Sequence, residues 1–281
     1  MKGVNLLAWA RFFRLANLPS ALSGVYLGTA LSASSGGPMT VLGLMISSAA
    51  IFSLGMGMND LIDLEKDRRN RPGRPLPAGE IKPFAARVAC AALGIIGLSC
   101  AAASGLDRLA LALVLIGLIS AYNFRYREGA VAGALLGLCR VVNFLLGLGL
   151  MSVDFRHLLP AAAYFLHVQL IMAVAAGEDA ERPLKFTDLP FALLPALILP
   201  LFAYPTGLAA GALWLLLTLS FLHRASRGNR QLRIKTVGLL VCSLVLLDCL
   251  FLFSAGQTCA AMAWLLVYLL SNPALKRVPG G

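Results

Sequence analysis

Residues 51–79 read IFSLGMGMNDLIDLEKDRRNRPGRPLPAG, and this segment is the most informative part of the chain. It begins in an apolar run and then changes abruptly to acidic residues, followed by a segment rich in arginine and proline. The apolar run extends back to residue 38, and a run of roughly 20 apolar residues is long enough to cross the hydrocarbon core of a bilayer as a helix. The stretch therefore predicts a membrane helix that ends in a charged loop at the membrane surface.

Apolar segments of similar length fill most of the remaining chain, separated by charged residues or by glycine and proline. The composition agrees, with 59% hydrophobic and only 13% charged residues. We therefore expect one all-α domain over residues 1–281, a polytopic integral membrane helical bundle of nine or ten transmembrane helices. The nine clear segments are 15–35, 38–58, 84–104, 106–122, 129–151, 157–176, 188–204, 206–222 and 234–255, and the weaker tenth is 257–271.

The loops differ strongly in their basic residues. With the N-terminus in the cytoplasm, the outer loops carry only Arg108 and Arg156, as expected if basic loops stay inside. The net charge of +11 then reports membrane orientation, and we expect membrane lipids and no nucleic acid as partners. The loops 59–83 and 177–187 meet on the cytoplasmic face. We predict a multi-pass protein of the bacterial cytoplasmic membrane with its active site facing the cytoplasm.

The acidic part of the opening stretch predicts a metal site. Asn59, Asp63 and Asp67 are spaced i, i+4 and i+8, so a continuous helix would place all three on one face. Mg²⁺ prefers oxygen ligands and is commonly shared between carboxylates and substrate phosphates. Because several arginines follow, the pattern favours a metal-bridged diphosphate. A solvated helix end with balancing salt bridges is the alternative for the acidic residues alone.

The spacing Asn59-x-x-x-Asp63-x-x-x-Asp67, followed by Arg-Pro-Leu-Pro-x-Gly at 74–79, resembles the first Asp-rich motif of the UbiA superfamily of membrane prenyltransferases. Two further segments share the resemblance. Arg14, Asn17 and Leu18 are similar to the family's entry to its first helix, and Tyr122 before Arg125 and Arg127 is similar to its tyrosine and basic segment.

The resemblance implies a helical bundle around a central cavity, a prenyl diphosphate donor, Mg²⁺ as cofactor and a lipophilic or amphipathic acceptor. Metal and cations would stabilise the departing diphosphate in a dry cavity. Metal ligands would be Asn59, Asp63, Asp67 and Asp179. Catalytic residues would be Asp63, Asp67, Arg71, Arg74 and Arg140, and substrate-binding residues Asn17, Asn59, Asp60, Tyr122, Arg125, Asn143, Glu178 and Asp179.

The second Asp-rich motif of the superfamily is not repeated here. Its place reads AVAAGEDAER over residues 173–182, with Glu178, Asp179 and Glu181 as the available carboxylates. They would hold a second metal or form a solvated helix end. The combination of RLANLPS at 14–20, RPGRP at 71–75, LCRVVN at 138–143 and Gly177-Glu178 resembles the EboC-type branch most closely.

Arg140, Asn143 and Asp248 lie within apolar segments and are expected to face inward, because a charge in the membrane is costly unless it is paired or faces a polar cavity. Arg140 and Asn143 lie one turn apart and would reach donor phosphate, an acceptor hydroxyl or a carboxylate such as Asp248. A structural arginine satisfied by carbonyls or an ion pair is the alternative. His167 is either an acid or base, or a packing residue.

The sequence thus predicts a UbiA-type prenyltransferase, one of the enzymes that transfer alkyl or aryl groups other than methyl, here a prenyl group from its diphosphate to an acceptor. The alternative is a membrane protein that binds or transports an isoprenoid diphosphate without turnover, because the second motif is degenerate. A general transporter fits the composition but gives no reason for the Asp63 and Asp67 spacing. A CDP-alcohol phosphotransferase would need an Asp-Gly-x-x-Ala-Arg signature, which the sequence lacks.

Overall fold

The computed structural model describes residues 5–33, 36–126, 129–180, 189–203, 205–226 and 230–277. Within these ranges every regular element is helical, which confirms the all-α prediction. The elements are α1 (Leu6–Phe12), η1 (Leu15–Asn17), α2 (Pro19–Leu31), α3 (Pro38–Ile62), α4 (Leu64–Asn70), α5 (Pro83–Ser104), α6 (Leu106–Phe124), α7 (Gly129–Leu148), η2 (Leu150–Ser152), η3 (Phe155–His157), α8 (Leu158–Ala180), α9 (Leu189–Phe202), α10 (Thr206–Ser226), α11 (Arg230–Ser254) and α12 (Thr258–Arg277).

Seven helical segments of the described chain are long and apolar enough to cross a membrane. They belong to α3, α5, α6, α7, η3 with α8, α10 and α11. Two segments expected to span are shorter, because α2 has 13 residues and α9 has 14. At 1.5 Å per residue these helices are about 20 Å long, against a hydrocarbon core of roughly 30 Å. The structure therefore supports a multi-pass membrane protein with seven candidate spans.

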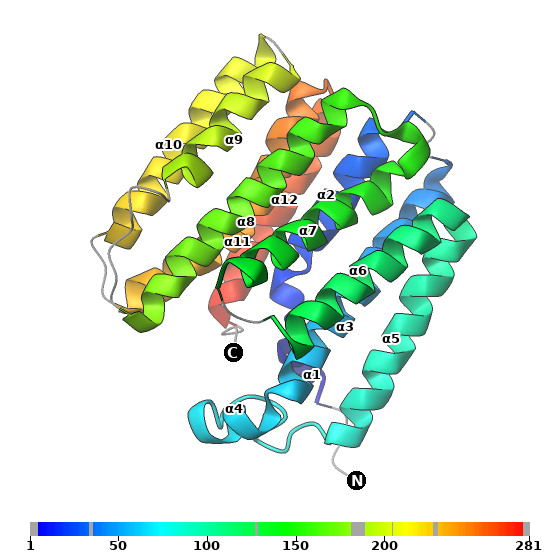
Figure 1. Ribbon diagram of the computed structural model, residues 1–281, viewed down its shortest axis with the longest axis vertical. Helices are drawn as coiled ribbons and strands as arrows, with labels where there is room; N and C mark the ends of the chain where they lie inside the picture. Colours follow the sequence, from blue (N-terminus) through cyan, green and yellow to red (C-terminus); the bar gives the residue numbers. More distant parts are fainter. Residues whose placement is uncertain are drawn as a thin grey trace.

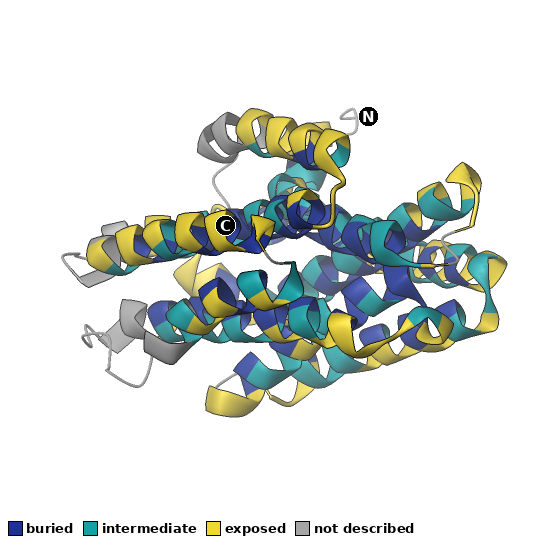
Figure 2. Cartoon of the chain, turned by 90° about the horizontal axis from the view of Figure 1, so that it is seen from above, coloured by how far each residue is buried: buried dark blue, intermediate teal, exposed yellow. Residues whose placement is uncertain are grey.

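The helices form one bundle in which α2, α7, α8 and α11 are central (Figure 1). Helices α9 and α10 lie on one side and α5 on the other, while α1, α4 and the N-terminus lie together at one end. Buried residues gather between the helices and exposed residues face outward (Figure 2). This outward surface is largely apolar, as expected where lipid replaces water, and Leu106, Ile95 and Leu197 are more than 60% exposed.

The expected first helix, 15–35, is wrong in its extent. Helix α1 ends before Arg14, whose backbone is left-handed with φ 49°, and Pro19 then starts α2. Helix α1 packs Phe12 against Leu76, Cys90 and neighbouring apolar residues. A left-handed arginine costs roughly 1–2 kcal/mol, so contacts elsewhere must stabilise this break.

Two glycines bring the central helices α2 and α7 into close contact. A Cβ atom at Gly28 would collide with the Phe144 carbonyl oxygen, and one at Gly147 would collide with that of Val25. Small residues at helix crossings let backbones approach in membranes, where no hydrophobic force drives helices together. This approach keeps the start of α2 within reach of polar side chains on α7.

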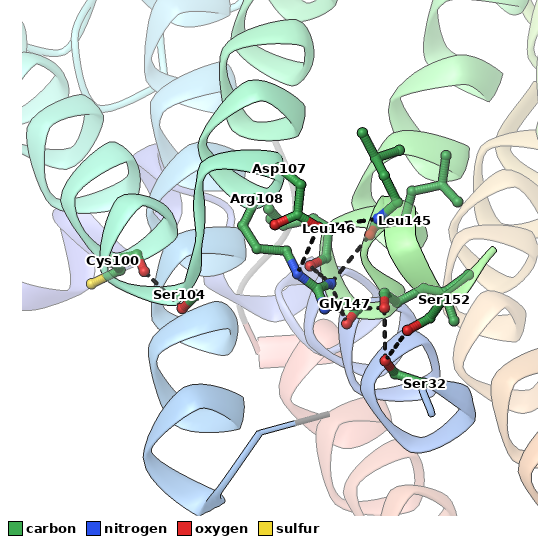
Figure 3. A network of polar contacts seen from close by, with 11 residues as sticks. Ser32, Cys100, Ser104, Asp107, Arg108, Leu145, Leu146, Gly147 and Ser152 are labelled. Carbon is green, nitrogen blue, oxygen red and sulfur yellow. Dashed lines mark hydrogen bonds and ion pairs between the residues drawn. The ribbon is translucent and has the colours of Figure 1, made fainter. Parts of the chain in front are cut away.

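Arg108 caps the C-terminal end of α7 (Figure 3). Its Nη1 atom donates to the carbonyl oxygens of Leu146 and Gly147, both at 2.6 Å, and Nη2 donates to that of Leu148 at 3.0 Å. Asp107 lies 3.5 Å from Nε. The last carbonyls of a helix lack partners within the helix and carry negative partial charge, so a buried cation satisfies both needs.

We expect Arg108→Gln to lower the free energy of unfolding by about 2–3 kcal/mol, because several buried carbonyls lose a charged donor. The measurement is thermal unfolding of the detergent-purified protein, followed by the loss of its monodisperse chromatographic peak. Arg156→Gln is the matched control, since Arg156 is exposed at the same end. Equal transition temperatures for the two variants would show that the cap contributes little.

Candidate functional site

The Asp-rich stretch is bent at its centre. Helix α3 ends at Ile62, Asp63 stands between the helices with φ −82° and ψ 1°, and α4 starts at Leu64. The single continuous helix expected over 59–67 is therefore wrong, because ψ near 0° departs from the helical value of about −42°. The i to i+4 backbone bonds from Asp63 to Asn59 and from Asp67 to Asp63 persist across the bend. Asn59, Asp63 and Asp67 thus stay one turn apart, although they do not share one straight face.

Asp60 and Asp67 are held by arginines in a buried cluster. Arg74 donates from Nη1 to Asp67 Oδ2 at 2.5 Å and to Asp60 Oδ1 at 3.3 Å. Arg14 donates from Nη2 to the same Asp60 oxygen at 3.0 Å. Asp60, Asp67 and Arg74 are each less than 7% exposed. The cluster ties the N-terminal segment, α3, α4 and the arginine-rich loop together.

The strained backbone of Arg14 is explained by this cluster. Its left-handed conformation directs the guanidinium to Asp60 and to Met56 Sδ, 3.5 Å away. Burial lowers the pKa of Arg14 from its ordinary value, while the charge of Asp60 acts in the opposite direction. Because an arginine remains protonated in proteins, the cluster keeps both of its cations at neutral pH.

A cavity of about 200 Å³ opens between α2, α3, α6, α7, α8 and α11. Its wall is largely apolar, and four of the predicted site residues contribute polar groups to it: Asn59, Tyr122, Arg140 and Asn143. The α3 wall consists of Ser48, Phe52, Gly55, Met56 and Asn59, spaced as one helix face. An apolar cavity with few polar groups is the usual form of a small-molecule site.

Arg140 and Asn143 form hydrogen bonds with the first residues of α2. Arg140 donates to the Ser20 carbonyl oxygen at 2.9 Å and to Ser20 Oγ at 3.0 Å. Asn143 donates from Nδ2 to the Ala21 carbonyl oxygen at 2.8 Å and accepts a bond from Ser48 Oγ at 2.6 Å. Both residues therefore face inward as predicted, and they join α2, α3 and α7 on one wall of the cavity.

The remaining predicted residues do not line this cavity. Asp63, Asp67 and Arg74 belong to the acidic stretch and its buried cluster, while Arg71 and Arg125 are exposed. Asn17 lines a much smaller pocket beside Ser20. The side chains of Glu178 and Asp179 and the whole of Glu181 lie outside the described residues.

Asn123 is a cavity residue that sequence reasoning missed. It is 3% exposed and donates from Nδ2 to the Ile119 carbonyl oxygen at 3.0 Å. Within the described chain its Oδ1 has no hydrogen-bond partner. Its position beside Tyr122 and the rarity of an amide in an apolar helix were available signals. Ser48 gave no comparable signal, because serine is a common packing residue between membrane helices.

Asp248 and His167 form polar contacts away from the cavity wall. Asp248 accepts bonds from Ser23 Oγ at 2.5 Å and from the Tyr164 hydroxyl, and its charge acts on Arg140 without an ion pair between the two in the described chain. His167 Nε2 lies 2.9 Å from the Leu240 carbonyl oxygen. These contacts favour the packing interpretation of His167 over that of an acid or base.

The described residues contain no group of three or more His, Cys, Asp or Glu side chains suited to a metal ion. Asn59, Asp63 and Asp67 nevertheless form an oxygen-rich set within nine residues. Mg²⁺ is commonly bound by one or two carboxylates together with substrate phosphates. The donor chemistry of this stretch therefore fits Mg²⁺ in the presence of a diphosphate.

Comparison with known proteins agrees with this arrangement. The sequence model of the UbiA prenyltransferase family matches residues 18–236. The chain is 37% identical over 90 residues to the digeranylgeranylglyceryl phosphate synthase of Methanoculleus marisnigri, covering 32% of each chain. It is 29% identical over 120 residues to that of Methanopyrus kandleri, covering 43% of each. The matches thus span about a third to two-fifths of these relatives.

Solved structures share the fold over nearly their whole length. A structure of digeranylgeranylglyceryl phosphate synthase has a TM-score of 0.66 at 20% identity, covering 89% of this chain and 98% of the other. A UbiA homologue from Archaeoglobus fulgidus, bound to GPP and Mg²⁺, has a TM-score of 0.65 at 17% identity, covering 87% and 99%. At these identities the likeness concerns the fold.

We expect Asp60 to stabilise the folded protein, because it is the shared counter-charge of Arg14 and Arg74. Asp60→Asn removes that charge and should lower the free energy of unfolding by about 3 kcal/mol. That corresponds to a thermal transition lower by roughly 6–12 °C. Glu65→Gln is the control, since its exposed pair with Arg68 should contribute at most about 1 kcal/mol. An Asp60→Asn protein as stable as the control would contradict the structural role.

Proposed function

Because this chain belongs to the UbiA prenyltransferase family, we propose that it transfers a prenyl group from an isoprenoid diphosphate to a lipophilic or amphipathic acceptor within the membrane. The main support for this proposal is the cavity. It offers an apolar wall for a prenyl chain, and its polar residue Asn59 begins the Asp-rich stretch. A donor whose tail lies in the cavity would place its diphosphate near Asp63, Asp67 and the following arginines.

The roles of the chain's residues follow from their charges. Asp63 and Asp67, with Asn59, would hold Mg²⁺, which when bound neutralises charge on the diphosphate. Arg74 and the exposed Arg71 would contact the remaining phosphate oxygens. Asp60 would keep Arg74 in position through their ion pair. Tyr122 and Asn123 would bound the headgroup end of the cavity.

The reaction breaks the bond between the allylic carbon of the donor and its bridging oxygen, and diphosphate leaves with the electron pair. A nucleophilic atom of the acceptor then bonds to that carbon and loses its proton. Cationic side chains lower the barrier if they stabilise the charge that develops on the leaving group. The apolar wall keeps water from capturing the allylic carbon.

The proposed topology has nine or ten crossings. Helices α2 and α9 would complete nine when added to the seven candidate spans, with α12 as a tenth. Short helices cross if the bilayer thins locally or if neighbouring helices cover their ends. The distribution of basic residues supports an active site that faces the cytoplasm, in a cytoplasmic membrane whose bacterial origin stays a prediction.

For the metal site we expect Asp63→Ala and Asp67→Ala each to weaken Mg²⁺-dependent binding of geranyl diphosphate by about tenfold or more, since a charge-assisted contact is commonly worth about 1.5–3 kcal/mol. Titration of the detergent-purified protein, with and without Mg²⁺, measures this. Glu65→Ala, which removes an exposed carboxylate, should change the affinity little. Equal losses in all three variants would indicate a general loss of structure.

A diphosphate-release assay on the same purified protein distinguishes an enzyme from a binding protein. Incubation with labelled geranyl diphosphate, Mg²⁺ and candidate acceptors should release diphosphate. If the carboxylates at 178–181 replace the second motif, Glu178→Gln, Asp179→Asn and Glu181→Gln should reduce turnover by at least about tenfold and affect donor affinity less. Glu80→Gln is the control, because Glu80 pairs with Arg11 on another loop. Donor binding by the wild type without release would favour the non-catalytic alternative.

A further inference from the structure

A second cavity, of about 420 Å³, lies at the end of the bundle opposite α1 and α4 (Figure 1). The last residues of α2, α9 and α11 surround it, together with the η2 and η3 turns that connect α7 to α8. Helix α3 leads from this end to the Asp-rich stretch, and its 25 residues span roughly 38 Å. The cavity is therefore separate from the proposed site of prenyl transfer.

Three hydrogen-bond donors of the cavity wall have no partner within the described chain. Ser254 is 8% exposed, and among the described residues its Oγ atom has no hydrogen bond. The backbone N–H of Asp154 donates to His157 Nδ1 at 3.1 Å, so Nε2 carries the proton of the neutral ring and is left as a free donor in the described chain. The guanidinium of Arg156 is exposed and forms no ion pair with a described residue.

Asp154 adds a carboxylate to the same wall. Its Oδ1 atom accepts bonds from the backbone N–H groups of Arg156 at 2.7 Å and of His157 at 3.3 Å, which caps η3. The other oxygen, Oδ2, has no hydrogen-bond partner in the part of the chain that the structure describes. The wall thus presents one cation and one anion beside two neutral donors. These charges are complementary to a ligand that carries both a negative and a positive group.

The rest of the wall is apolar, and it lies at the level of the lipid headgroups. Its apolar side chains are those of Leu31, Ala33, Phe202, Ala203 and Ala255. Ser254 is the last residue of a segment that is long and apolar enough to cross the membrane, so the cavity begins where the hydrocarbon core ends. A ligand with hydrocarbon next to its charged group would contact both parts of the wall, whereas a small soluble ion would contact only the polar part.

We propose that this cavity binds a phospholipid whose headgroup joins a phosphate to a primary ammonium, as in phosphatidylethanolamine. The phosphate oxygens accept hydrogen bonds from Arg156, His157 Nε2 and Ser254 Oγ. The ammonium donates to Asp154 Oδ2, and the upper part of the acyl chains lies on the apolar wall. The bound lipid connects the ends of α2, α9 and α11 to the turns between α7 and α8. This role is independent of the proposed transfer reaction.

The test compares phospholipids that share dioleoyl chains and differ in headgroup: phosphatidylethanolamine, phosphatidylcholine and phosphatidylglycerol. Native mass spectrometry of the full-length, delipidated protein in detergent gives a dissociation constant for each. Phosphatidylethanolamine should bind about tenfold more tightly than the other two, because choline has no N–H to donate and glycerol has no positive charge. Soluble glycerophosphoethanolamine, which lacks the acyl chains, should not displace the lipid at equal concentration.

Two variants separate the phosphate contact from the ammonium contact. Asp154→Asn keeps a side-chain oxygen to cap η3 but loses the charge, so it should bind phosphatidylethanolamine only as tightly as phosphatidylcholine. Arg156→Gln should weaken the binding of all three lipids about tenfold, because each of them carries a phosphate. Arg87→Gln is the control, since it removes an exposed arginine at the other end of the bundle, and it should change none of the affinities.

Thermal unfolding distinguishes lost lipid contacts from lost structure. Without lipid, Ser254→Ala should unfold at the wild-type temperature or above it, because the hydroxyl that it removes has no partner in the described chain. Added phosphatidylethanolamine should raise the transition temperature of the wild type more than that of Ser254→Ala. All variants should still bind geranyl diphosphate with Mg²⁺ as the wild type does.

The inference is overturned if the wild type binds either of the other lipids as tightly as phosphatidylethanolamine, or if the preference persists in Asp154→Asn. Displacement of the lipid by an equal concentration of glycerophosphoethanolamine would contradict a lipid as the occupant. Failure of the wild type to bind or cleave geranyl diphosphate contradicts only the proposed function, because the two sites lie at opposite ends of the bundle.

Discussion

The ion pairs of Asp60 hold the segment before α2 and the loop after α4 against the end of α3. One carboxylate oxygen accepts bonds from Arg14, at a strained turn before α2, and from Arg74, in the loop after α4. These arginines lie far apart in the chain and have few other polar partners in the described residues. Because separating either cation from its buried counter-charge is costly, the loop stays folded over the end of α3. The Asp-rich stretch is thereby held beside the cavity.

Three sets of buried arginines show how the protein handles cations in an apolar setting. Arg108 is satisfied by the terminal carbonyls of α7, and Arg14 with Arg74 by Asp60. These contacts hold Arg14, Arg74 and Arg108 in place, and within the described residues Arg74 Nε is left without a hydrogen-bond partner. Arg140 differs, because its bonds go only to Ser20 and it remains accessible from the cavity.

The sequence predicted the helical class and the inward positions of Arg140 and Asn143. Both predictions need only one segment of the chain, because they depend on the length of an apolar run and on the cost of placing a polar group inside the membrane. It did not predict the break at Arg14, since a left-handed arginine is stabilised by Asp60, 46 residues away. The bend at Asp63 was missed for the same reason, as Arg74 draws Asp67 into the buried cluster. Ser48 became recognisable only once α3 and α7 were assembled around one cavity, whereas the amide of Asn123 in an apolar helix was a signal that the sequence already offered.

Asp67 belongs both to the proposed metal site and to the buried cluster with Arg74 and Asp60. Its ion pair with Arg74 engages Oδ2, and within the described chain this leaves Oδ1 to another ligand. A carboxylate has two oxygens, so Asp67 can hold a cation on one while it keeps Arg74 on the other. Arg74 in turn reaches Asp60 and through it Arg14. The ion pairs of Asp67, Arg74, Asp60 and Arg14 therefore form one row that joins α4 and the loop after it to α3 and to the segment before α2.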